Sequence, residues 1–233
     1  MAVLAILASL LLAACGKARA SSQSITCVNN LRQLQIAWLM YADDHTDTLP
    51  PNQDHFSDGA WRSLPGSWVV GNAQEDSSST NIESGVLFPY IRALPIYHCP
   101  ADRTRFSGKT PLLRHRSYML SIYLNGAAFS GRVKDKTTRI SNPVEVFVLL
   151  DASGWTINDG VFNLACASEA GDANWYDDPS DRHSMGCNLT FADGRVGRLK
   201  WQWPKTAGSY ATRSVNQADL HDLQRLQALI PEP

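Results

Sequence analysis

The residues best placed to do chemistry in this 233-residue chain are His183 and Asp193, which nine residues separate, with Gly194 directly after. An imidazole and a carboxylate can exchange protons or share a metal ion. A structural interpretation competes, because Asp-Gly between two apolar runs is a strong hairpin signal. We favour the latter: Asp193 and Gly194 form a type I′ turn, and His183 caps the preceding strand. With no hydrolase elbow, phosphate loop or dinucleotide fingerprint, we expect no enzyme.

Two acidic groups offer oxygen ligands of the kind that calcium prefers. Asp43, Asp44 and Asp47 lack the Asp-x-Asp-x-Asp-Gly loop pattern, so we expect a solvated helix end. The other group lies in a loop containing Gly and Pro and consists of Asp172, Asp177, Asp178 and Asp181. We expect a solvent-exposed loop there and no cofactor in the protein, with calcium as the lesser alternative.

Five cysteines stand at positions 15, 27, 99, 166 and 187, without a C-x-x-C pair, which argues against zinc ribbons and thioredoxin-like sites. His98 adjoins Cys99, but one His and one Cys are too few for a metal site. If the body lies outside the cytoplasm, disulfides are allowed. We favour Cys27 with Cys99 and Cys166 with Cys187, and buried free thiols are the alternative.

Composition bounds the class of protein. Hydrophobic residues make up 44% and charged residues 18% of the chain, which is typical of a globular body. The net charge is −1 and the cations are scattered, so no nucleic-acid partner is expected. We divide the chain into a stem, residues 1–46, and a globular domain, residues 47–233.

The body combines strands, long loops and short helices. Strands are predicted over residues 117–124, 144–150, 186–192 and 195–203, the last two forming the Asp-Gly hairpin. Residues 83–94 have helical spacing. A closing helix is expected after an Asn216 N-cap. Its buried face would hold Leu220, Leu223, Leu226, Leu229 and Ile230.

The stem has two parts. Residues 2–14 are almost entirely apolar and continue without proline into an amphipathic segment. Its apolar face recurs at helical spacing and consists of Cys27, Leu31, Leu34, Trp38 and Tyr41. The polar face holds Asn29, Asn30, Arg32, Gln33 and Gln35. We expect one helix to about residue 45, ending before Pro50.

Three interpretations of the apolar run stay open. About 13 residues reach about 20 Å, short of the ~30 Å core of a bilayer. A secretory signal would fit this length but needs a basic start, which is missing. Leu12-Ala-Ala-Cys15 is similar to a lipobox, which would make the protein an envelope lipoprotein or anchored binding protein. In the third interpretation, Met1 is an internal methionine within a pilin-type stem.

The motifs together resemble the large prepilin-type proteins of planctomycete and verrucomicrobium type, which are pseudopilin relatives with a C-terminal H-X9-DG motif. That motif stands here as His183 to Asp193-Gly194. Further matches are Cys27-Val-Asn-Asn-Leu-Arg-Gln-Leu34, Tyr41-Ala-Asp-Asp44, Leu49-Pro-Pro51, Cys99-Pro-Ala-Asp102, Arg116-Ser-Tyr118 and the strand ending at Asp151. The family's basic leader, Gly-Phe cleavage site and early Glu are absent from this sequence.

The resemblance implies an α+β, pilin-like fold in which a long N-terminal helix packs on an antiparallel sheet. It implies a structural subunit of a type II secretion or type IV pilus-like system. Such a subunit would sit in the bacterial inner membrane through its N-terminal helix, with the body on the periplasmic side, and would contact other pilin-like subunits. An envelope enzyme centred on His183 is the least favoured alternative.

Overall fold

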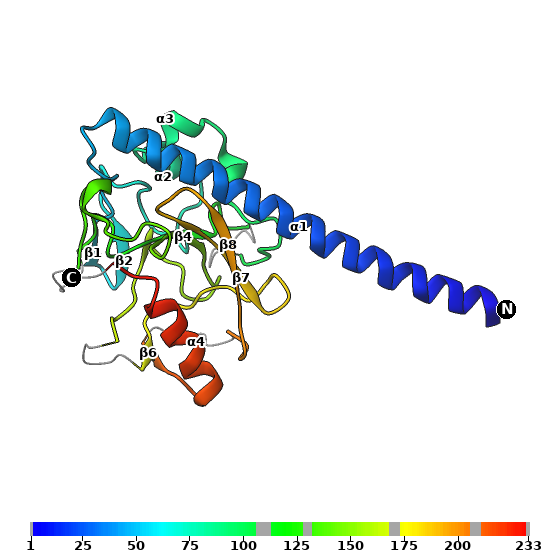
Figure 1. Ribbon diagram of the computed structural model, residues 1–233. Helices are drawn as coiled ribbons and strands as arrows, with labels where there is room; N and C mark the ends of the chain where they lie inside the picture. Colours follow the sequence, from blue (N-terminus) through cyan, green and yellow to red (C-terminus); the bar gives the residue numbers. More distant parts are fainter. Residues whose placement is uncertain (1, 106–112, 128–131, 168–172, 206–210, 232–233) are drawn as a thin grey trace.

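The structure is a computed structural model that describes residues 2–105, 113–127, 132–167, 173–205 and 211–231, with the backbone alone for residues 2–6, 8 and 10. It is an α+β protein with one long N-terminal helix (Figure 1). The first element is helix α1, Ala2–Asp44. Its first part projects beyond the body, and its second part lies across the body. The chain turns away at residues 45–47, before the prolines at positions 50 and 51, as expected.

The central sheet has five strands in the order β5-β3-β4-β7-β8. They are β3 Tyr118–Ser121, β4 Phe147–Asp151, β5 Val161–Phe162, β7 Gly186–Phe191 and β8 Val196–Lys200. All neighbours pair antiparallel except β3 and β5, which are parallel. The sheet is therefore mixed rather than purely antiparallel, because β5 reaches the edge through a long loop instead of a hairpin.

Short elements surround this sheet. Two two-stranded ribbons pair β1 Asp54–Ser57 with β2 Ala60–Ser63 and β6 Asn174–Trp175 with β9 Thr212–Arg213. The helices are α2 Thr80–Glu83, α3 Phe88–Ile91, η1 Leu94–Tyr97, η2 Thr137–Arg139 and α4 Gln217–Gln227. The predicted helix over residues 83–94 is wrong as a single element: Pro89 and Pro95 start new turns, and Arg92 is left-handed between them.

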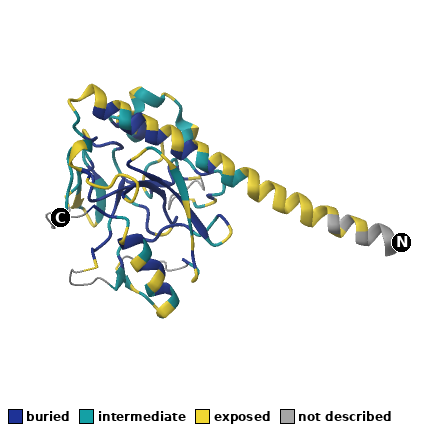
Figure 2. Cartoon of the chain, viewed as in Figure 1, coloured by how far each residue is buried: buried dark blue, intermediate teal, exposed yellow. Residues whose placement is uncertain are grey.

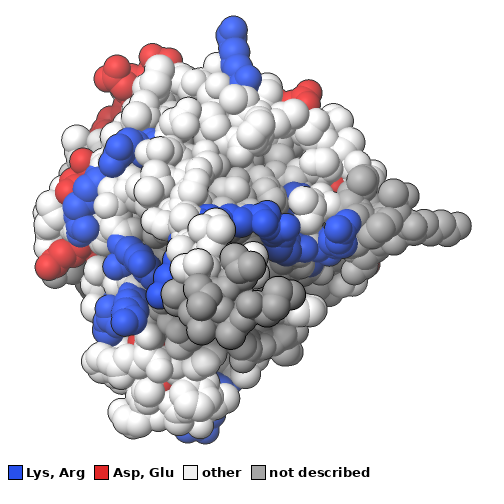
Figure 3. Space-filling model, turned by 90° about the vertical axis from the view of Figure 1, so that its right-hand side faces the viewer, with Lys and Arg blue, Asp and Glu red and all other residues white. Residues whose placement is uncertain are grey.

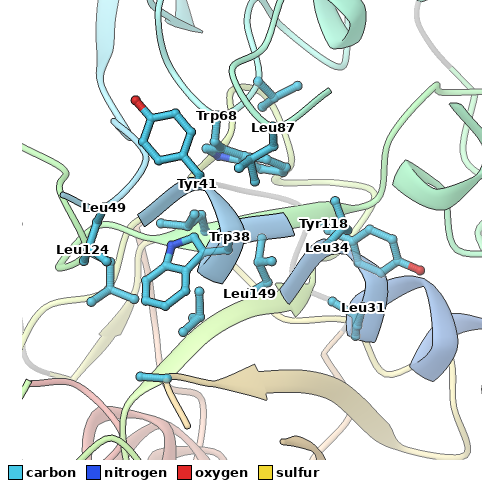
Figure 4. Close-up of a cluster of buried hydrophobic side chains, with 14 of the residues drawn as sticks. Leu31, Leu34, Trp38, Tyr41, Leu49, Trp68, Leu87, Tyr118, Leu124 and Leu149 are labelled. Carbon is cyan, nitrogen blue, oxygen red and sulfur yellow. The ribbon is translucent and has the colours of Figure 1, made fainter. Parts of the chain in front are cut away.

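The second part of α1 supplies one side of the core. All five residues of its predicted apolar face are buried, and they meet residues of β3, β4 and the loops (Figure 4). Alternation along β3 sends Tyr118 and Leu120 to this cluster and Met119 to the opposite face. The opposite cluster includes Leu223 and Leu226 of α4. The sheet thus lies between α1 and α4.

The prediction of a polar face on α1 is partly wrong, since Asn30 and Gln35 are buried. For Asn30 the reason is that α1 also contacts α3 and η1, outside the sheet. Asn30 donates hydrogen bonds from Nδ2 to the carbonyls of Pro95, at 3.3 Å, and His98, at 3.0 Å. An amphipathic pattern predicts one buried face, and here the helix is buried from two directions.

The β7–β8 hairpin is confirmed, but its turn type is not I′. Gly194 has a φ of +93°, whereas Asp193 is not among the residues with positive φ. The Gly194 N–H donates to the carbonyl of Phe191, and the Phe191 N–H to that of Arg195. This is a three-residue loop with a type I turn followed by a left-handed glycine. Asp193 Oδ1 accepts from the Arg195 N–H at 3.1 Å, which fixes the turn.

Helix α4 begins as expected. Asn216 Oδ1 accepts a hydrogen bond from the Asp219 N–H at 3.0 Å, which is an N-cap. Of the predicted apolar face, Leu223, Leu226 and Ile230 are buried, and Leu220 and Leu229 pack against them partly buried.

The first part of α1 has no cover. Every described side chain from residue 7 to residue 22 is exposed, including Leu11 at 66% and Leu12 at 74% (Figure 2). We call residues 2–22 the free half of α1 and residues 27–44 its packed half. Among the described residues, no helix combines the length and the apolar character that crossing a bilayer demands.

The packed half should control stability position by position. Leu34→Ala should lower the free energy of unfolding by about 2–5 kcal/mol, because it removes a fully buried side chain and leaves a cavity. Ile36→Ala, on the same helix but half-exposed, should cost less than about 1 kcal/mol. Urea unfolding followed by circular dichroism measures both. Equal losses would contradict this packing.

A buried carboxyl pair predicts an unusual pH dependence. Burial, followed by the charge of the neighbouring Asp54, raises the pKa of Asp159 to about 7, and burial also raises the pKa of Asp54. The folded state therefore keeps a proton that the unfolded state releases above about pH 4. Stability from this pair falls as the pH rises from about 4 to about 7.

Asp159→Asn removes this loss of stability. Its amide oxygen can still accept the hydrogen bond that the Val161 N–H donates to Asp159 Oδ1 at 2.8 Å. We expect the variant to melt a few degrees above the wild type at pH 8 and close to it at pH 4. Thermal unfolding across this pH range is the measurement. A difference that does not change with pH would show that the pair is not the cause.

Candidate functional site

His183 does not meet Asp193. It precedes β7, while Asp193 follows β7, so the six residues of that strand separate them along its length. A strand of six residues spans about 20 Å. The nine-residue spacing of the motif is thus the length of one strand and its turns. Asp193 and Gly194 form the hairpin turn at one end of β7, and His183 lies at the other end.

Four side chains converge at the His183 end of the sheet: Cys27, Cys99, Asp151 and His183. Their sulfur, oxygen and nitrogen atoms all lie within 4.8 Å of one another, and all four residues are buried. His183 Nε2 lies 3.3 Å from Cys99 Sγ and 3.3 Å from Asp151 Oδ2. The expected cap of the strand is therefore a buried contact of the imidazole with a thiol and a carboxylate.

Four separate segments supply these groups. Cys27 is the first buried residue of α1, at the point where the helix meets the body. Cys99 follows η1, and its N–H donates to Ser117 Oγ at 3.1 Å, beside β3. Asp151 ends β4, and His183 lies in the loop that leads into β7. The site depends on the whole tertiary fold, since no two of the four are neighbours in sequence.

Asp151 is the centre of a buried ionic network. Its Oδ2 accepts a hydrogen bond from Ser180 Oγ at 2.6 Å, and its Oδ1 forms a short ion pair with Arg182. Arg182 also pairs with Asp102 Oδ1 at 3.3 Å. Asp102 Oδ2 in turn accepts from Ser117 Oγ at 2.7 Å, which returns the chain of contacts to Cys99. These contacts hold Oδ2 of Asp151 facing His183.

The surroundings set the protonation of the site. Burial by itself would lower the pKa of His183, but its hydrogen bonds with Asp151 and Cys99 raise it to about 9. Burial would raise the pKa of Asp151, and Arg182 and His183 outweigh it and hold the pKa below its usual value. Hydrogen bonding with Cys27, together with burial, raises the pKa of the Cys99 thiol. Imidazolium, carboxylate and thiol thus stabilise one another.

Tyr118 borders the cluster from β3. It is fully buried, and its hydroxyl has no hydrogen bond of normal geometry among the described residues. Burial, followed by the proximity of Cys27 and Cys99, raises the pKa of that hydroxyl. The site thus contains a phenol donor in addition to its four converging groups.

A surface pocket of about 440 Å³ reaches the cluster. His183, Arg182 and Arg198 line it from the body, and Lys17 and Ser24 line it from α1. The His183 side chain itself is buried, so the pocket ends beside the cluster rather than opening it to solvent.

The remaining predicted site residues lie elsewhere. All five cysteines are thiols in the structure: Cys15 is exposed and the others are buried. Cys27 and Cys99 are neighbours, as the preferred disulfide requires. Cys187 donates from Sγ to the carbonyl of Asp151 at 3.1 Å. Cys166 is buried near the opposite cluster of the core.

The acidic groups do not form ligand sets. Asp47 accepts hydrogen bonds from Thr137 and Thr138, and Asp44 accepts one from Tyr90. Asp177 and Asp178 are buried rather than solvent-exposed, contrary to the expected loop, and Asp172 lies outside the described residues. Among the described residues, Cys27, Cys99, Asp151 and His183 form the one group of three or more His, Cys, Asp or Glu side chains with the spacing to share a metal ion.

Comparison of the chain with family models, with curated proteins and with solved structures gives no match. Function is therefore argued from the geometry of the chain itself.

Removal of Arg182 should test the ionic network. Arg182→Met leaves the Asp102 and Asp151 carboxylates, both fully buried, without their shared cation. Stranding buried charge costs about 3–5 kcal/mol of unfolding free energy. Arg139→Met is the control, since its pair with Asp135 is exposed and worth under about 0.5 kcal/mol. Chemical denaturation gives both values, and a loss under about 1 kcal/mol for Arg182→Met would refute the network.

Proposed function

We propose that the protein is a membrane-anchored, pseudopilin-like structural subunit of a type II secretion or type IV pilus-like system. The single observation behind this is the division of α1, whose packed half is built into the core while its free half projects with exposed leucines. An apolar helix surface of this extent needs an apolar partner. The body of the same chain does not provide one among the described residues.

The bilayer is the first partner in this proposal. The apolar run of residues 2–14 reaches about 20 Å, which is two thirds of the hydrocarbon core, so it enters the membrane as an anchor. Lys17 and Arg19 follow directly and are exposed. Cations at this position suit the phosphate level of the membrane surface.

The charge of the body agrees with this orientation. Lys and Arg side chains gather on the face from which the free half leaves the body (Figure 3). Arg182 and Arg198 line the pocket beside Lys17 on this side. A body that stands on an anionic membrane surface gains attraction from such a face, by roughly 1 kcal/mol for each cation near the surface.

Other subunits are the second partner. When subunits assemble, their free halves leave the lipid and pack side by side, so their leucines stay buried throughout. The body contributes no chemistry to this process. Its role is to hold α1 rigidly, through the packed half, so that each free half leaves the body in the same direction.

Cys15 offers a direct test, because it is exposed on the free half while the other four cysteines are buried. Membranes from cells producing the full chain are treated with copper-phenanthroline, which oxidises two neighbouring thiols to a disulfide. We expect dimers linked through Cys15 and none from Cys15→Ser. Trp155→Cys in that background, at an exposed site on the body, should give few dimers.

A second prediction concerns the anchor. Leu12→Glu places a charge on the apolar run and should move most of the protein from the membrane fraction to the soluble fraction, with loss of the dimers. Gln33→Glu, at an exposed site of the packed half, should leave both unchanged. Intact mass separates the lipoprotein alternative, since acylation at Cys15 removes the first 14 residues and adds lipid mass. That mass, or a wild type found only in the soluble fraction, would refute the proposal.

A further inference from the structure

We propose that Cys27, Cys99, Asp151 and His183 bind a zinc ion that fastens α1 to the sheet where the helix enters the body. The proposal is independent of the membrane role. It rests on the convergence of four metal-binding side chains from four segments into one buried volume.

The spacing of the ligand atoms suits tetrahedral zinc. With Zn–S near ~2.3 Å and Zn–N and Zn–O near ~2.0 Å, tetrahedral geometry separates S from N by about 3.5 Å and N from O by about 3.3 Å. The structure has 3.3 Å between Cys99 Sγ and His183 Nε2, and 3.3 Å between His183 Nε2 and Asp151 Oδ2. No pair exceeds 4.8 Å, so the widest pair must close by about 1–1.5 Å to reach the ~3.3–3.8 Å that separates zinc-bound atoms.

The chemistry of the four groups also favours a metal. All four side chains are of types that ligate metals once deprotonated, and their ligand atoms lie within 4.8 Å of one another. A zinc ion serves all four, and binding it releases the thiol protons and the imidazole Nε2 proton to solvent. Two thiolates, an imidazole and a carboxylate are ligand types that zinc takes in structural sites.

The outer contacts are those of a prepared site. Asp151 keeps Oδ1 on Arg182 and holds Oδ2 toward His183, so the carboxylate has one orientation. Two thiolates and a carboxylate around Zn²⁺ leave one net negative charge, and Arg182, which also pairs with Asp102, lies beside it. The Tyr118 hydroxyl is buried beside Cys27 and can donate to its thiolate. Such outer partners orient ligands and adjust metal affinity.

The location of the site gives the ion a mechanical role. Cys27 is where the packed half of α1 begins, and the other ligands belong to the η1 loop, β4 and the loop before β7. Zinc would cross-link these four segments at the base of the free half. The pocket between α1 and Arg198 provides a route from solvent to His183.

The test uses the full chain, purified in detergent without chelators. Mass spectrometry of its metal content should give about one zinc per chain. A strong chelator should remove this zinc and lower the melting temperature by several degrees, and added Zn²⁺ should restore the zinc content and the melting temperature. Cobalt(II) in place of zinc should give the intense visible bands of a tetrahedral ion and a thiolate-to-cobalt charge-transfer band.

Variants assign the ligands. Cys99→Ser and His183→Gln should reduce bound zinc at least tenfold and abolish the cobalt spectrum, while Cys166→Ser, which alters a buried thiol outside the set, should bind fully. If a ligand variant does not fold, the zinc content and cobalt spectrum of the wild type still decide. A Cys27–Cys99 disulfide in the isolated protein, or no stoichiometric metal after growth with zinc, would overturn the proposal. Neither result depends on whether Cys15 cross-links.

Discussion

The carboxylate of Asp151 is the constraint on which the rest of this structure depends. It is fully buried at the end of a central strand, where an uncompensated charge would cost several kcal/mol. Arg182 and His183 compensate it, and both come from the loop that leads into β7. These two contacts therefore fix the position of that loop relative to β4. They also fix the start of the β7–β8 hairpin, which follows the loop.

The same network carries the constraint outward to α1. His183 contacts Cys99, and Cys99 adjoins Cys27, so the buried charge is linked through side chains to the base of the free half. The apolar face of the packed half supplies the energy of this junction, because hydrophobic burial is large but has no direction. The polar contacts add direction, because hydrogen bonds and ion pairs depend on the orientation of their groups.

Much of the fold could be predicted from local patterns. The apolar face of α1, the hairpin at Gly194 and the Asn216 cap each follow from spacing within a few residues, where backbone geometry and side-chain chemistry act directly. The failures have a common cause in tertiary context. Asn30 is buried because a second layer covers α1, and β5 pairs parallel because of a long connection; neither is encoded near the residues affected.

The candidate site shows the same division. Asp151 was visible as the end of an apolar strand, and His183 as part of a spaced motif in which the favoured interpretation was a hairpin turn at Asp193-Gly194. That interpretation separates His183 from Asp193 by the length of a strand, about 20 Å, but it does not say which residues His183 contacts. The available signal was that Cys27 begins an apolar helical face while Cys99 and Asp151 adjoin core strands, so all three had to point inward. Only the packing of α1 on the sheet brings these buried ends to one place, which makes the site a consequence of the fold.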